Sequence, residues 1–109
     1  MEKSNIFVRI ELSKLVPGLS HDVALSKQHL ISQAGYFNII PPKYFSQALC
    51  PEWENIIRQV RKKGPKLDER GRVISNAVTN TIDQMSSQEC TEIAWRITEL
   101  YEKVKLEFE

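Results

Sequence analysis

The sequence has few of the residues from which catalytic and metal sites are commonly built. Its 109 residues include only two histidines and two cysteines. His21 and His29 lie eight positions apart, which on a helix is about 12 Å of rise and too far for one metal ion. The HExxH, CxxC and CxxH patterns are absent, as are glycine-rich phosphate loops and the GxSxG nucleophile motif. The sequence therefore indicates no metal site, no cofactor and no catalytic residue.

Long apolar runs are also absent. No stretch approaches the roughly 18 apolar residues that a membrane-spanning helix needs, and charged residues interrupt the apolar positions after Met1. We therefore expect a cytoplasmic protein with no membrane partner. In that reducing compartment Cys50 and Cys90 are predicted to be free thiols. Cys50 lies at an expected helix start, which could lower its pKa, whereas Cys90 falls on an apolar stripe and is expected to be inert.

Length and composition are those of one ordinary globular domain. Hydrophobic residues make up 41% of the chain and charged residues 27%, so residues 1–109 are expected to fold as a single unit. The net charge of +1 hides an uneven distribution. Residues 58–72 carry seven basic and two acidic side chains, whereas residues 73–109 carry three basic and seven acidic ones. This polarity favours steering of a charged partner or neutralisation within the fold.

Residues 6–12 alternate between apolar and polar positions. Ile6, Val8, Ile10 and Leu12 would share one face of a strand, and three of the four are β-branched. A lone strand leaves its backbone groups unpaired, so it needs a partner. The candidates within the chain are residues 36–40, which precede a proline pair, and residues 104–108. A homodimer that pairs this N-terminal strand between two chains is a further alternative.

Helical spacing covers most of the remaining chain. Apolar residues recur at three- and four-residue intervals, and Ser86 and Glu89 form a capping box before the last helix. The first helix has two alternative starts, at Ser20 and Ser26. The fold class predicted is α+β and mostly helical, with three or four helices packed on a two- or three-stranded sheet that includes the N-terminal strand. The expected helices are 21–34, 42–49, 51–63, 73–85 and one from residue 87 onward.

One basic junction stands out between the second and third of the long helical segments. Gly64-Pro65 ends the helix there, since glycine tolerates a left-handed turn and proline cannot continue the ladder. The cations could contact phosphates or an acidic protein surface. The plainer interpretation is a solvated helix end that complements the helix dipole and pairs with the acidic last helix. The candidate binding residues at this junction are Arg58, Arg61, Lys62, Lys66, Arg70 and Arg72.

A second candidate surface is aromatic. Tyr36, Phe37 and Tyr44 fall in the middle third of the chain, close to Phe45 and Trp53. Filling the core is their plainer role. Because tyrosine and tryptophan often anchor interfaces, a partner-binding surface is the alternative.

Three functional classes remain open. The first is a small non-enzymatic protein that binds another protein, as an inhibitor, an immunity factor or a regulatory factor does. The second is a nucleic-acid-associated protein that uses residues 58–72. The third is an enzyme with a site that the sequence does not reveal. The absence of a catalytic constellation, the small size and the polarised charge favour the first class.

Overall fold

The fold comes from a computed structural model, which describes residues 3–108. Six α-helices, two short 3-10 helices and one two-stranded antiparallel sheet occur in this range. The elements in chain order are α1 (Lys3–Leu15), η1 (Val16–Gly18), α2 (Ser26–Ser32), α3 (Tyr36–Ile39), η2 (Pro42–Tyr44), α4 (Cys50–Arg61), β1 (Lys66–Leu67), β2 (Val73–Ser75), α5 (Ala77–Gln84) and α6 (Ser87–Leu106).

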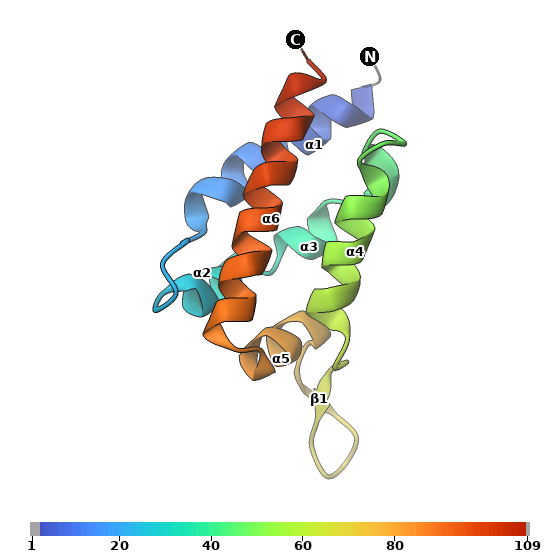
Figure 1. The fold of residues 1–109 in the computed structure, drawn as a ribbon. Helices are drawn as coiled ribbons and strands as arrows, with labels where there is room; N and C mark the ends of the chain where they lie inside the picture. Colours follow the sequence, from blue (N-terminus) through green and yellow to red (C-terminus); the bar gives the residue numbers. More distant parts are fainter. Residues whose placement is uncertain (1–2, 109) are drawn as a thin grey trace.

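The long helix α6 is the element on which the others pack. It runs diagonally across the molecule in Figure 1 and contacts α1, α2 and α4. The predicted capping box is confirmed, because the Ser86 hydroxyl accepts from the Glu89 amide and the Glu89 carboxylate accepts from the Ser86 amide. Its predicted apolar stripe is also confirmed. The buried residues of α6 are Cys90, Ile93, Ala94, Ile97, Leu100 and Val104.

Helix α4 supplies the largest buried side chain. Trp53 is fully buried, its ring stacks against Phe37 and Phe45, and its Nε1 donates to the Ile40 carbonyl at 2.8 Å. A buried indole needs such an acceptor. The tryptophan therefore ties α4 to the segment around α3 and η2.

The predicted N-terminal strand is wrong, because residues 6–12 belong to α1. The helix buries Val8, Leu12 and Leu15, spaced i, i+4 and i+7, against the core. Ile6 and Ile10, which a strand would place on the same face as Val8, are 45% and 48% exposed. Packing of this helical stripe on α6 overrides the β propensity of the branched residues. A homodimer through an N-terminal strand loses its basis with it.

The two proposed partner strands are also helical. Residues 36–39 form α3, and only Ile40, which precedes Pro41, is extended. Residues 104–106 complete α6, where Val104 is buried. The sheet lies instead in β1 and β2, where a loop and the start of a helix were expected. The predicted packing of helices on a sheet is therefore wrong. β1 and β2 form a hairpin in which the side chains of the strands are almost all exposed.

The structure decides one helix start that the sequence left open and corrects another. Helix α2 begins at Ser26, the later of the two alternatives, and buries the Ser26 hydroxyl against Thr91 at 2.8 Å. Helix α5 begins at Ala77 rather than residue 73, because Asn76 caps it by accepting from the Thr79 amide at 2.8 Å. The expected helix 42–49 is reduced to the 3-10 turn η2.

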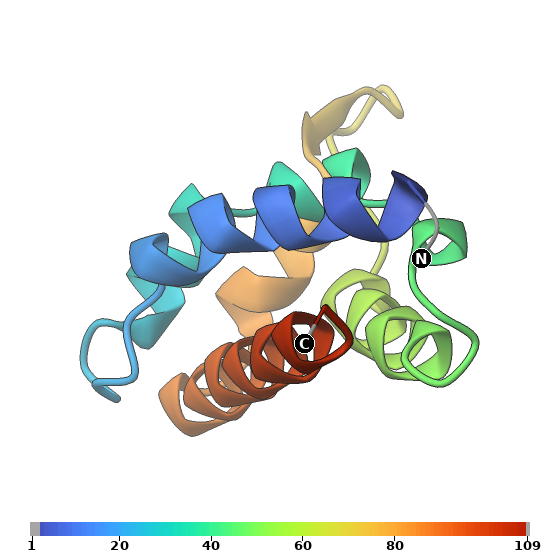
Figure 2. The ribbon, with the colours of Figure 1, turned by 90° about the horizontal axis from the view of Figure 1, so that it is seen from above.

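The hairpin projects from the helical body. In Figure 1 it extends below α5, at the end of the molecule opposite the C-terminal end of α6. In Figure 2 the hairpin and α6 lie on opposite sides of the molecule. None of the helices in residues 3–108 is long and apolar enough to cross a membrane.

The N-terminal helix can be tested against the strand interpretation with one pair of variants. Val8 is 1% exposed and Ile10 is 48% exposed. We expect Val8→Asp to lower the free energy of unfolding by about 3 kcal/mol or more, because it buries a charge, and Ile10→Asp to change it by about 0.5 kcal/mol. Urea unfolding followed by circular dichroism measures both. Equal losses in the two variants would support a strand that buries both residues.

Candidate functional site

Two hydrogen bonds hold the base of the hairpin between α4 and α5. The Lys63 amide donates to the hydroxyl of the fully buried Thr81 at 3.1 Å. The Asn80 side-chain amide donates to the Gly64 carbonyl at 2.9 Å. Gly64 has a φ of 67°, a conformation that glycine adopts without strain. The chain therefore leaves α4 in a fixed direction, and the helix ends before Gly64-Pro65, as that stop signal predicted.

The tip of the hairpin is organised by one carboxylate. Asp68 Oδ1 accepts from the backbone amides of Arg70 and Arg72 at 2.8 and 2.9 Å, and Oδ2 accepts from Arg72 Nε at 3.1 Å. The Gly71 amide closes the turn on the Asp68 carbonyl, and Gly71 has a φ of 79°. This is a three-residue loop with glycine at the left-handed position, a favoured hairpin connection. The loop is therefore an ordered turn.

The hairpin exposes apolar side chains beside its cations. Leu67, Val73 and Ile74 are 52%, 61% and 59% exposed. Lys66 and Arg70 are exposed on the same hairpin. Exposed apolar residues that gather on one projecting element are a feature of interaction sites.

The strand edges are poorly suited to accept another strand. Each strand has only two or three residues, Pro65 precedes β1, and the pairing is irregular between the Lys66–Ser75 and Leu67–Val73 partners. Short strands, proline, lysine and bulges are the devices that protect sheet edges. A partner would therefore meet the side chains of the hairpin.

The structure divides the predicted basic residues into three groups. Arg61 is occupied, since it donates to the Phe37 carbonyl at 3.3 Å and to Asn38 Oδ1. Arg58 is exposed on α4, and Lys62 lines a hollow between helices. Lys66, Arg70 and Arg72 lie on the hairpin, and among the described residues only Arg72 of this basic set forms an ion pair, with Asp68. The expected ion pairing with the last helix does not occur in this part of the chain.

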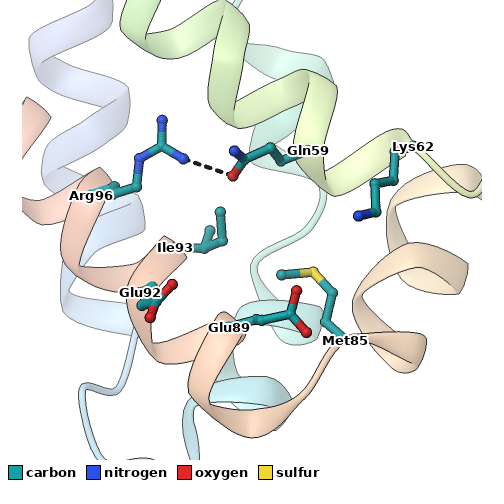
Figure 3. Close-up of a pocket in the computed structure, with 7 residues that line it drawn as sticks. All are labelled: Gln59, Lys62, Met85, Glu89, Glu92, Ile93 and Arg96. Carbon is teal, nitrogen blue, oxygen red and sulfur yellow. Dashed lines mark hydrogen bonds between the residues drawn. The ribbon is translucent and has the colours of Figure 1, made fainter.

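The hollow beside Lys62 holds about 250 Å³ and lies between α4 and α6 (Figure 3). Lys62 lines it from the end of α4, and Glu89, Glu92 and Arg96 line it from α6. Arg96 is held by Gln59 Oε1 at 2.7 Å and by Asn55 Oδ1 at 2.9 Å, and Glu89 belongs to the capping box. Hydrogen bonds from Ser86, first from its backbone amide, lower the pKa of Glu89. Arg96 thus serves a helix contact and Glu89 a helix cap, and the two cations of the hollow balance its two carboxylates.

The predicted aromatic set does not form one surface. Phe37 is 2% exposed and stacks on Trp53 with ring centroids 5.6 Å apart, so it belongs to the core. Tyr44 packs edge-on against Phe7 at 5.5 Å, and Tyr36 is half-buried against the core. The plainer role suits Phe37, whereas parts of Tyr36 and Tyr44 remain accessible.

Sequence reasoning missed Trp95. This residue is 50% exposed on α6, and its ring lies 4.1 Å from the ring of His21. His21 Nε2 is 2.8 Å from the Thr98 hydroxyl, which orients the imidazole. The signal was present in the spacing, because position 95 falls between the positions that form the apolar stripe of the last helix. Tryptophan at such a position is a candidate interface anchor.

Neither cysteine is activated. Both are free, as predicted. A hydrogen bond from Cys50 Sγ to Glu54 at 2.9 Å raises the pKa of the Cys50 thiol, opposite to the expected effect of a helix N-terminus. Burial raises the pKa of Cys90. Both thiols are therefore poor nucleophiles near neutral pH.

The chain matches no family model, and no curated protein or solved structure matches it.

The hairpin tip should respond to pH through Asp68. Hydrogen bonds, first from the Arg72 amide, lower the pKa of Asp68 below its usual 3.8. The ionised carboxylate therefore stabilises the turn fully above the usual pKa of 3.8. This stabilisation is lost as the pH falls through the lowered pKa. We expect the protection of the Arg70 and Arg72 amides from exchange, relative to an unstructured chain at the same pH, to fall below about pH 4 before the helices unfold.

The control for this titration is Asp68→Asn, which keeps an acceptor oxygen but does not titrate. In that variant the protection of the two amides should not fall in acid before that of the helices does. Exchange followed by NMR measures this directly. The same loss of protection at Arg70 and Arg72 in Asp68→Asn would contradict the role given to the carboxylate.

Proposed function

We propose that this chain is a small non-enzymatic protein that acts by binding another protein, and that the hairpin β1–β2 is its recognition element. The observation that carries the proposal is the exposure of Leu67, Val73 and Ile74 at 52–61% on a projecting element. These side chains would bury apolar surface on a partner, at about 25 cal/mol per Å² removed from water. Cations on the same element would steer the encounter.

The order of the hairpin supports this role. The Asp68 turn and the two bonds at the base fix its shape and direction before any partner arrives. A preordered element loses less conformational entropy on binding than a flexible loop does. The poor nucleophilicity of both thiols and the internal use of the polar groups in the hollow favour a binding role over catalysis.

Nucleic-acid binding is the second candidate. Its support is that Arg58, Lys62, Lys63, Lys66 and Arg70 have no carboxylate within 4.0 Å among the described residues. Cations of this kind can neutralise phosphates. Against it, no aromatic residue occurs between Trp53 and Trp95, so the basic segment itself offers no ring for base stacking. The apolar hairpin residues also gain little from a phosphate backbone.

An affinity capture distinguishes the two candidates. Immobilised protein is incubated with extract of the cells it comes from, with and without nuclease. We expect a protein partner in near-equal amount that resists nuclease, and a reduction of at least roughly tenfold in its recovery by Leu67→Ser/Ile74→Ser, which removes apolar contact area.

The matched control is Ile6→Ser/Ile10→Ser, which truncates two isoleucines of similar exposure on α1 and should leave recovery unchanged. Absence of any stoichiometric protein would contradict the proposal. Recovery that disappears with nuclease would favour the nucleic-acid candidate in its place.

A further inference from the structure

The outward face of α6 carries a stripe of acidic and apolar residues. Its members follow one another at intervals of three or four positions, and all are exposed. Three of them are glutamates and none is basic. The acidic stripe consists of Gln88, Glu92, Trp95, Glu99, Glu102 and Leu106.

Two apolar side chains of the acidic stripe are available for contact. Trp95 is 50% exposed and Leu106 is 62% exposed. Contact with the tilted ring of His21 holds the Trp95 ring at the surface. Of the three glutamates, only Glu102 forms an ion pair among the described residues, with Lys105 at 2.9 Å. Glu99 therefore presents charge without an ion-pair partner in this part of the chain, whereas Glu92 lies at the rim of the hollow that Lys62 and Arg96 also line.

The acidic stripe is complementary to the hairpin in both charge and apolar character. The hairpin carries Lys66, Arg70 and Arg72 against Asp68, which pairs with Arg72, and the exposed Glu69, and it exposes Leu67, Val73 and Ile74. The acidic stripe combines glutamates with exposed tryptophan and leucine. Opposite charges around matching apolar groups favour both encounter and correct orientation.

The two surfaces cannot meet within one molecule. Figures 1 and 2 place the hairpin beyond α5 and on the side of the body away from α6. The bonds of Lys63 to Thr81 and of Asn80 to Gly64 hold it there. A contact between hairpin and acidic stripe must therefore join two molecules. Because it uses different surfaces on the two partners, it leaves one free hairpin and one free stripe, and can extend.

We propose that the hairpin of one molecule docks on the acidic stripe of a second copy of this chain. The inference rests on the proposed use of the hairpin as a protein-binding element. It names the acidic stripe of a second copy as the surface that the hairpin binds. A different protein partner would then compete with self-association by presenting a similar acidic and apolar helix face. A small contact of this kind is expected to be weak and strongly dependent on salt.

Sedimentation equilibrium of the whole chain tests the proposal. Between roughly 10 µM and 1 mM protein at about 20 mM salt, the average mass should rise beyond that of a dimer, and about 0.5 M salt should weaken association by roughly tenfold or more. A monomer throughout this range would overturn the proposal.

Two variants then locate the interface. Arg70→Ser/Ile74→Ser removes the hairpin contact and Trp95→Ser/Glu99→Gln removes the stripe contact, in both cases at exposed positions. Each variant alone should be a monomer. An equal mixture should form a dimer that grows no further, because each molecule keeps the surface that the other has lost. The control Ile6→Ser/Ile10→Ser should associate as the unmodified chain does.

Association that persists unchanged in either variant, or a mixture that stays monomeric, would overturn the proposal. This failure is distinct from failure of the proposed function. A chain that is monomeric alone but captures a partner through Leu67 and Ile74 keeps its binding role and loses only self-association. A chain that associates with itself but captures no partner keeps self-association and loses the proposed binding of another protein.

Discussion

The direction of the hairpin depends on two hydrogen bonds where the chain leaves α4 and rejoins the helical body. The Lys63 amide reaches the buried Thr81 hydroxyl, and Asn80 holds the Gly64 carbonyl. Lys63 and Gly64 directly follow α4, and Asn80 and Thr81 belong to α5. Helix α4 is itself anchored by the buried Trp53. Without these constraints the cations and apolar residues beyond Gly64 would form a mobile loop. With them, these residues lie on a hairpin that projects in a fixed direction.

The charge asymmetry of the sequence therefore becomes a separation in space. Lys66, Arg70 and Arg72 lie on the hairpin, and Glu92, Glu99 and Glu102 are exposed on α6, which lies on the other side of the body (Figure 2). Neutralisation within the fold, which the sequence allowed, would require close ion pairs between the two. Among the described residues, the hairpin has one ion pair, internal to its own turn. Both charged surfaces are thus left for partners, and each also exposes apolar side chains.

Sequence reasoning located the elements whose local signals agree. Helix α4 combines an apolar stripe with Pro51 in its first turn and a Gly64-Pro65 stop, and α6 combines a stripe with the Ser86 capping box. It failed at α1, because Val8 and Leu12 fit both a two-residue period and an i, i+4 helix, and only the position of the core decides between them. The hairpin was missed because its strands are too short to show a period. The exposure of Trp95 was predictable from helical spacing, because position 95 lies off the apolar stripe of α6.

Order of the hairpin in solution is the central requirement of this account. The most direct measurement is ¹⁵N relaxation of the free protein at low concentration. The account predicts backbone order parameters of about 0.85 for Leu67, Val73 and Ile74, equal to those of α4 and α6. Values below about 0.6 at these residues, with rigid helices beside them, would show a flexible loop and contradict a preformed recognition element.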